Sequence, residues 1–163
     1  MLTVLKFLPG FLWALPVSLL TWIFFCIPYY LKGAFEKVTM RKDLSIIWDV
    51  ANDSKFYKKS MTGWYGFVLG CNIVVVDVPS KDDDWWADHL DHETTHVYQN
   101  YIFGILFYVV YLIHMAYLLA FCKDKHSYHD NFLERWARKS AGQLVDIPRE
   151  DWMDGPNDRF PWN

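Results

Sequence analysis

The strongest constraint on this chain is a long uncharged apolar segment near its start. Residues 7–31, FLPGFLWALPVSLLTWIFFCIPYYL, contain no charged side chain, and only Ser18 and Thr21 are clearly polar. A helix rises about 1.5 Å per residue, so a segment of this length can cross a hydrocarbon core of about 30 Å. No small-x-small cleavage site follows it, which favours a membrane anchor over a secretory signal peptide.

Two further features bear on how this segment meets a membrane. Its prolines predict kinks, or a broken helix that re-enters on the same side; they are Pro9, Pro16 and Pro28. Lys6 precedes the segment, whereas several basic residues follow it closely: Lys32, Lys37, Arg41 and Lys42. The positive-inside rule then places the rest of the chain on the cytoplasmic side. We therefore expect membrane lipid as a partner of residues 1–31, which form an anchor or a re-entrant hairpin.

Composition narrows the class of protein. The chain has the length of one domain, 163 residues, and 19% of them are aromatic, which suits a membrane–water interface. The formal net charge of −3 provides no basic surface, so we expect no nucleic-acid partner. Three widely spaced cysteines predict free thiols rather than a disulfide framework: Cys26, Cys71 and Cys122.

Short strand-like runs and helices follow the apolar segment. Residues 44–50 and 63–78 are rich in β-branched side chains and predict strands, with a turn near Gly70. A helix capped at Ser80 comes next, and a second apolar run occupies 101–122. The pattern is that of an α+β domain.

The last predicted helix is NFLERWARKSAG, residues 131–142. Asn131 stands at its N-cap position and Gly142 at its C-cap position. The remaining residues, 143–163, carry three prolines and predict an extended tail.

The motif HETTH, residues 92–96, predicts a metal site. On a helix, His92 and His96 lie one turn apart on the same face, so both imidazoles can reach one ion at about 2.0–2.1 Å. Glu93 is rotated away from them and suits the role of general base for a water activated by the metal. His89 is about 10.5 Å along the helix axis from His96, too far to bind the same ion, and we expect it at the surface or in a supporting position.

A zinc site of this kind needs a third protein ligand. The downstream candidates are His114, His126, His129 and Glu134. His114 lies in the apolar run and is more typical of a packed histidine. Glu134 also stands three residues after Asn131, where a capping-box glutamate would stand. We prefer Glu134 as the ligand because Ala137, one turn later, allows its helix to approach the HETTH helix closely.

This ligand set conflicts with a membrane-spanning reading of residues 101–122. Such a helix would carry the chain about 33 Å away, and residues 123–131 return at most about 30 Å when fully extended. A lone extended strand through lipid would leave its backbone groups unsatisfied. We therefore expect this helix to lie in the interface or to pack within the protein.

Residues 92–99, HETTHVYQ, and 128–137, YHDNFLERWA, resemble the signature of short membrane-associated proteins of bacteria and their phages. That signature is similar to HExxHxxQ followed by YxDNxxExxA and, more broadly, to the gluzincin arrangement of zinc peptidases. The resemblance implies His92, His96 and Glu134 as zinc ligands and Glu93 as the catalytic base. It also implies supporting or substrate-contacting positions without an assigned role: Gln99, Tyr128, Asp130 and Asn131.

The sequence thus predicts a small zincin-like α+β domain, residues 32–142, between the N-terminal membrane segment and the tail. The leading hypothesis is a membrane-associated, Zn²⁺-dependent metallopeptidase of bacterial or phage origin that faces the cytoplasm and hydrolyses a peptide or protein of unknown identity. The alternative is a structural or assembly protein of a membrane or virion that retains a zinc site without catalysis.

Overall fold

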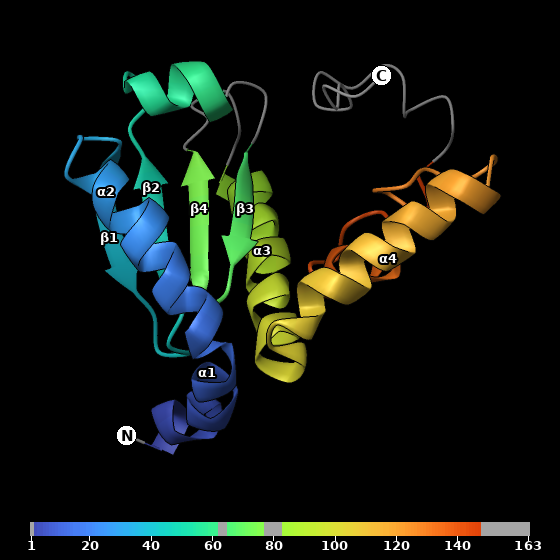
Figure 1. Ribbon diagram of the computed structural model, residues 1–163, viewed down its shortest axis with the longest axis horizontal. Coiled ribbons are helices and arrows are strands. Elements are labelled where there is room, and N and C mark those ends of the chain that lie inside the picture. The colour runs from blue at the N-terminus through green and yellow to red at the C-terminus, as the bar shows by residue number, and fades with distance from the viewer. Residues whose placement is uncertain (1, 62–64, 77–82, 148–163) are drawn as a thin grey trace.

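A computed structural model of the chain describes residues 2–61, 65–76 and 83–147. A four-stranded sheet lies between two helical layers (Figure 1). The first layer is formed by α1 (Leu2–Thr21), a π-helical segment over Trp22–Cys26, and α2 (Ile27–Tyr30). The second is α3 (Asp83–Phe103). The predicted α+β class is confirmed.

The sheet has the order β1-β2-β4-β3. Its strands are β1 (Phe35–Met40), β2 (Ile46–Val50), β3 (Gly66–Leu69) and β4 (Asn72–Val76). β2 and β4 run parallel, and the other two neighbouring pairs are antiparallel. All five residues of β4 are buried, as expected for a central strand that is covered on both faces.

The strands predicted at 44–50 and 63–78 are present, and Gly70 forms the turn between β3 and β4 with a φ of +66°. β1 was not predicted, because most of its residues are exposed and it shows no clean alternation. A short π-helical segment over Tyr57–Met61 connects β2 to β3.

The N-terminal segment is one helical stretch, Leu5–Tyr30, which is long and apolar enough to cross a membrane; a signal sequence would share these properties. Within the described residues the helix continues through the prolines without a break, and the anchor or re-entrant hairpin over residues 1–31 stays a prediction. Pro9 and Pro16 lie inside α1, and the π-helical segment directly precedes Pro28. Proline has no backbone N–H to donate within a helix. A local π-helical segment adjusts the hydrogen-bond pattern before the proline, so the helix continues.

The second apolar run begins with a sharp bend rather than a new straight helix. Residues 101–103 still belong to α3, and α4 covers Leu106–Phe121. The axes of α3 and α4 meet at 112°. Gly104, with a φ of +57°, makes the bend, and a Cβ atom there would lie 2.5 Å from the Trp13 indole nitrogen of α1.

The last helix, α5 (Phe132–Ser140), packs against α3. The predicted N-cap is confirmed, since the Asn131 side chain accepts a hydrogen bond from Leu133 N at 3.1 Å. Gly142, just past the helix, has a φ of +71°. The predicted cap at Ser80 and the tail beyond residue 147 lie outside the described residues, and the division into three segments stays a prediction.

Candidate metal centre

The centre of α3 buries polar side chains. His92, Glu93, Thr94, Thr95 and His96 are all buried. The two threonine hydroxyls donate hydrogen bonds to backbone carbonyl oxygens of the same helix: Thr94 to Leu90 O at 2.6 Å and Thr95 to Asp91 O at 3.0 Å. Because these hydroxyls are satisfied within the helix, α3 can bury them with little cost.

The fold brings His92, His96 and Glu134 into one buried group whose donor atoms could hold a metal ion. The two Nε2 atoms lie 3.1 Å apart. Glu134 Oε2 is 3.2 Å from His92 Nε2, and Glu134 Oε1 is 3.3 Å from His96 Nε2. The three ligands predicted from the sequence therefore converge, although α5 lies about forty residues after the motif (residue 134 against 92 and 96).

These spacings fit a small tetrahedral ion. Ligand atoms at about 2.0–2.1 Å from a tetrahedral zinc lie about 3.3 Å from one another. The observed separations of 3.1–3.3 Å are close to that value. Glu134 Oε2 is buried and has His92 Nε2 at 3.2 Å as a neighbour, so this carboxylate oxygen needs a shared proton or a cation between the two atoms.

Each imidazole is oriented by an amide oxygen on its other nitrogen. His96 Nδ1 lies 2.8 Å from Gln99 Oε1, and His92 Nδ1 lies 3.0 Å from Gln143 Oε1. An amide oxygen can only accept, so both Nδ1 atoms carry the proton. The Nε2 atoms that face Glu134 are therefore the ones that can bind a metal once any proton on them has left, as in zinc sites whose histidines are held by outer hydrogen bonds.

Glu134 is held by α4 and by the start of α5. Tyr111 donates its hydroxyl proton to Glu134 Oε1 at 2.8 Å. The Asn131 side chain donates to Tyr111 O at 3.1 Å, which ties the N-cap of α5 to α4. Glu134 occupies the third position after this N-cap, but its carboxylate faces the histidines, so its capping-box reading is wrong.

The charges of the group are strongly coupled. Burial lowers the pKa of His96, but the charge and hydrogen bond of Glu134, together with the charge of Glu93 and the hydrogen bond to Gln99, outweigh burial and raise this pKa to about 9. Burial raises the pKa of Glu134, yet the two histidines hold it well below its usual range. Without a metal, the centre is thus an imidazolium–carboxylate pair at neutral pH.

Glu93 points toward the sheet, one residue around the helix from His92. A Cβ atom at Gly66, the first residue of β3, would lie 3.3 Å from Glu93 Oε1. The His89 Nε2 atom is 3.9 Å from the same oxygen. His89 is largely buried and stacks on Trp85. It therefore packs beside Glu93 and is not part of the group of candidate ligands. Burial lowers the pKa of His89, more than the charge of Glu93 raises it.

The remaining motif positions now have contacts. Gln99 joins His96 to α5, because its Nε2 atom also donates to Leu133 O at 2.9 Å. Asp130 accepts a hydrogen bond from His126 N at 2.8 Å and therefore shapes the loop before α5. Burial, followed by the charges of Glu134 and Glu93, raises the pKa of Tyr128 well above its usual value, which places this phenol beside the centre.

The other candidate ligands have different roles. His114 Nδ1 accepts a hydrogen bond from Phe132 N at 3.2 Å, as expected for a packed histidine. His126 Nδ1 accepts from His129 N at 3.1 Å. Arg138, which is buried one turn after Glu134, donates to the carbonyl oxygen of His129.

Sequence reasoning missed Tyr111, Gln143 and Arg138. Tyr111 is one of several tyrosines in an apolar run, and Gln143 lies just beyond the last helix, so neither stands out by residue type or spacing. Arg138 carried one signal, since it lies four residues after Glu134 and therefore on the same helix face.

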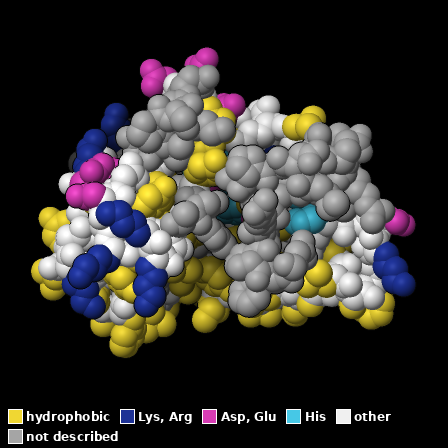
Figure 2. Space-filling model, turned by 90° about the horizontal axis from the view of Figure 1, so that it is seen from above, with side chains coloured by type: hydrophobic (Ala, Val, Ile, Leu, Met, Phe, Trp, Pro, Cys, Tyr) yellow, Lys and Arg dark blue, Asp and Glu magenta, His cyan; other side chains and the backbone are white. Residues whose placement is uncertain are grey.

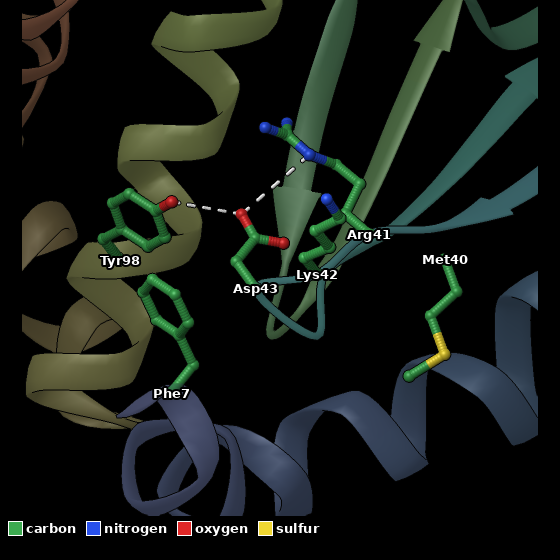
Figure 3. A pocket seen from close by; sticks show the side chains of 6 residues that line it. All are labelled: Phe7, Met40, Arg41, Lys42, Asp43 and Tyr98. Atoms are coloured by element: carbon green, nitrogen blue, oxygen red, sulfur yellow. Dashed lines mark hydrogen bonds and ion pairs between the residues drawn. The ribbon is translucent and has the colours of Figure 1, made fainter. Parts of the chain in front are cut away.

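A separate hollow lies on a different side of α3 from the metal centre, between Tyr98 of α3 and Phe7 of α1 (Figure 3). Its volume is about 420 Å³, and its lining residues are Phe7, Met40, Arg41, Lys42, Asp43 and Tyr98. The Tyr98 hydroxyl donates to Asp43 Oδ2 at 3.1 Å, and Arg41 Nε lies 3.9 Å from the same oxygen. These contacts hold the β1–β2 turn against α3 and α1.

No protein-family model, curated protein or solved structure matches this chain. Its chemistry is therefore inferred from the donors of the centre and from the groups around them.

Proposed function

We propose that this protein is a membrane-associated, zinc-dependent metallopeptidase of the gluzincin kind. The observation that carries the proposal is the buried group His92, His96 and Glu134, with Glu93 beside it on the same helix. Two imidazoles and one carboxylate form a ligand set that is common in catalytic zinc sites, which keep a fourth position for water or substrate.

Zinc suits these residues better than magnesium or calcium. Magnesium and calcium prefer oxygen ligands in larger number, whereas imidazole nitrogens at tetrahedral spacing favour zinc. When bound, zinc would supply Lewis acidity, which lowers the pKa of a water molecule and polarises a carbonyl group.

The chain's own residues supply proton transfer and orientation. Glu93 would accept a proton from the attacking water and return it to the leaving amine, the role that a carboxylate in this position can fill. Tyr128 stays protonated at neutral pH, because its pKa is raised by burial and by Glu134 and Glu93. Its hydroxyl is hydrogen-bonded with Glu134 and so helps to hold this ligand in place.

A peptide substrate would bind along a sheet edge. The central strand β4 cannot take the peptide, because it is paired on both sides, with β2 and with β3. Within the described residues, β3 is the edge strand next to α3. Gly66 of β3 lies against Glu93, so a peptide added to this edge would pass close to the proposed base.

The test compares the wild-type protein with Glu93→Gln and with a matched control, Glu36→Gln, whose carboxylate is exposed on β1. Each full-length protein is purified in detergent and loaded with zinc. Zinc content is measured by mass spectrometry of the metal, and hydrolysis with unfolded casein and a fluorogenic peptide library. We expect all three proteins to keep zinc and Glu93→Gln to lose about 10²–10⁴-fold in rate.

Full activity in Glu93→Gln would contradict the proposal. A zinc-loaded wild-type protein that cleaves nothing in either assay, but loses stability when the metal is removed, would favour the structural role instead.

A further inference from the structure

The N-terminal helical stretch carries its polar side chains on the side that faces the protein. Ser18 is fully buried, and its hydroxyl accepts a hydrogen bond from Cys71 N at 2.9 Å. Thr21 is buried too, and donates to Val17 O at 2.9 Å. The outward side is apolar, with exposed Leu8, Leu12, Trp13, Leu19, Leu20, Ile23, Phe24 and Ile27. This polarity is the reverse of that in a helix on the surface of a water-soluble domain.

α4 repeats the pattern. Its Tyr108 hydroxyl accepts a hydrogen bond from Gly70 N at 2.7 Å, and Tyr111 bonds Glu134, so both phenols face the protein. Its outward side is again made of large apolar side chains: Leu106, Val109, Leu112, Ile113, Tyr117, Leu119 and Phe121.

Both outward sides lie on one face of the molecule. α1 and α4 stand in front of the sheet and of α5 in Figure 1. Seen from above, hydrophobic side chains line the lower edge of the molecule across its width, which is that front face (Figure 2). Lys6 and Lys32, at the two ends of the N-terminal stretch, are exposed.

A spanning orientation of this stretch would bring part of the domain into lipid. β1 runs beside it, since Phe35 at one end of β1 contacts Phe25 and Met40 at the other end lines a hollow with Phe7. From residue 7 to residue 25 the helix rises about 27 Å, most of a hydrocarbon core. Exposed Glu36 and Lys37 lie between these levels.

The cost of that orientation is large. A charged side chain in the bilayer centre costs several kcal/mol on common scales, and an open sheet edge does not occur in the hydrocarbon region. Among the described strands, β1 is such an edge. The helix therefore cannot stand upright in a bilayer while it stays docked on the sheet.

We propose that the protein is monotopic: α1 and α4 lie flat in one leaflet, with their outward sides in the acyl region and the sheet and α3 in water. Interfacial helices bury their apolar side about 5–10 Å deep in this way. Lipid suits the surface better than a second copy of the chain, because protein interfaces carry about one hydrogen bond per 100–200 Å². Between Lys6 and Tyr30, the exposed residues offer only the Trp13 indole for such bonds.

This placement also locates the metal centre. Tyr111 faces Glu134, while Leu112 and Ile113 of the same helix face outward. The centre thus lies about one helix diameter, about 10–12 Å, from the acyl chains, on the aqueous side. If the proposed peptidase function holds, its substrates are peptide segments close to the surface of the same membrane.

The first test uses the unmodified full-length protein in sealed membrane vesicles of both orientations. An impermeant amine reagent is added outside, and modified lysines are identified by mass spectrometry. We expect Lys6 and Lys32 to react from the same face. Reaction from opposite faces would mean that the helix spans, and would overturn the proposal.

The second test measures contact with lipid. Single cysteines replace Leu12, Leu20 and Ile113 in turn, or Lys37 as the control, in a chain with Cys26→Ala, Cys71→Ala and Cys122→Ser. A bimane label is quenched by nitroxide-bearing lipid in phosphatidylcholine vesicles. We expect quenching at Leu12→Cys, Leu20→Cys and Ile113→Cys, with all three labels at a similar depth in the bilayer. We expect no quenching at Lys37→Cys. Labels that are shielded from both lipid and water would indicate a second copy on this face.

The third test uses affinity for vesicles. Leu20→Glu and Ile113→Glu should each weaken binding of the full-length protein to phosphatidylcholine vesicles by about tenfold or more. The control Ser60→Glu, which adds the same charge at an exposed site, should change it little. Equal binding of all three variants would overturn the proposal. These readouts need no catalysis and can be repeated in Glu93→Gln, so failure of the peptidase function would be seen separately.

Discussion

α3 and α4 follow one another along the chain, yet α3 buries many polar side chains whereas α4 exposes many apolar ones. α3 turns histidines, glutamate, threonines and amides toward the interior, whereas α4 exposes leucine, isoleucine, valine and phenylalanine. The difference shows that the side chains on each helix face match what that face contacts. They do not follow a simple rule of apolar residues inside and polar residues outside. The inward face of α3 provides hydrogen-bond partners for its polar side chains and room for a cation. The exposed leucine, isoleucine, valine and phenylalanine side chains of α4 form no hydrogen bonds.

The largest effect that tests this comparison is loss of the metal. His92→Ala, His96→Ala and Glu134→Ala should each reduce bound zinc from about one ion per chain to almost none, because three-ligand sites rarely survive the loss of one ligand. Metal content of the purified protein is the measurement. His114→Ala, which removes a packed histidine outside the group, should keep the ion, and equal metal loss in this variant would mean that the interior of α3 is not a specific site.

The next effect is competition between the metal and a proton. Because the pKa of His96 is raised to about 9, a proton must leave it before zinc can bind. Zinc affinity should therefore rise about tenfold per pH unit up to about pH 9 and then level off. The metal-free protein should behave in the opposite way: its ion pair stabilises the fold below the unfolded pKa of histidine, and this contribution is lost as pH rises through about 9. Calorimetric titration and thermal unfolding across pH measure the two trends.

A smaller effect concerns the amide that orients His92. Gln143→Ala should weaken zinc binding about 10–100-fold, which is typical when the outer partner of a metal-bound histidine is removed. Gln143→Glu keeps an acceptor on Nδ1 and should retain the affinity. Leu144→Ala, at the exposed neighbouring position, is the control. If Gln143→Ala bound zinc as tightly as the wild type, the amide would not orient the ligand.

The smallest effect tests the polar inward side of α1. Ser18→Ala removes the acceptor of Cys71 N and should cost about 1–3 kcal/mol, because a buried donor is left unsatisfied. Leu19→Ala, on the outward side, should change stability by about 0.5 kcal/mol or less in detergent. Unfolding monitored by circular dichroism compares the two variants. A larger loss in Leu19→Ala would mean that the outward side packs on protein.

Local patterns in the sequence were enough for the features that depend on neighbours along the chain. The i, i+4 spacing of His92 and His96 placed both ligands on one helix face, Asn131 marked the start of α5, and Gly70 marked the turn between β3 and β4. Each depends on contacts within a few residues, so residue type and spacing carry the information.

Tertiary structure alone decided the rest, because it depends on contacts between distant segments. The sequence offered four candidates for the third ligand, and the packing of α5 on α3 selected Glu134. The orienting groups Tyr111 and Gln143 come from two further segments, and no local pattern connects them to His92 or Glu134. The two apolar runs could be recognised from composition, but their outward directions follow from the 112° bend after α3 and from the docking of Ser18 on the β3–β4 turn.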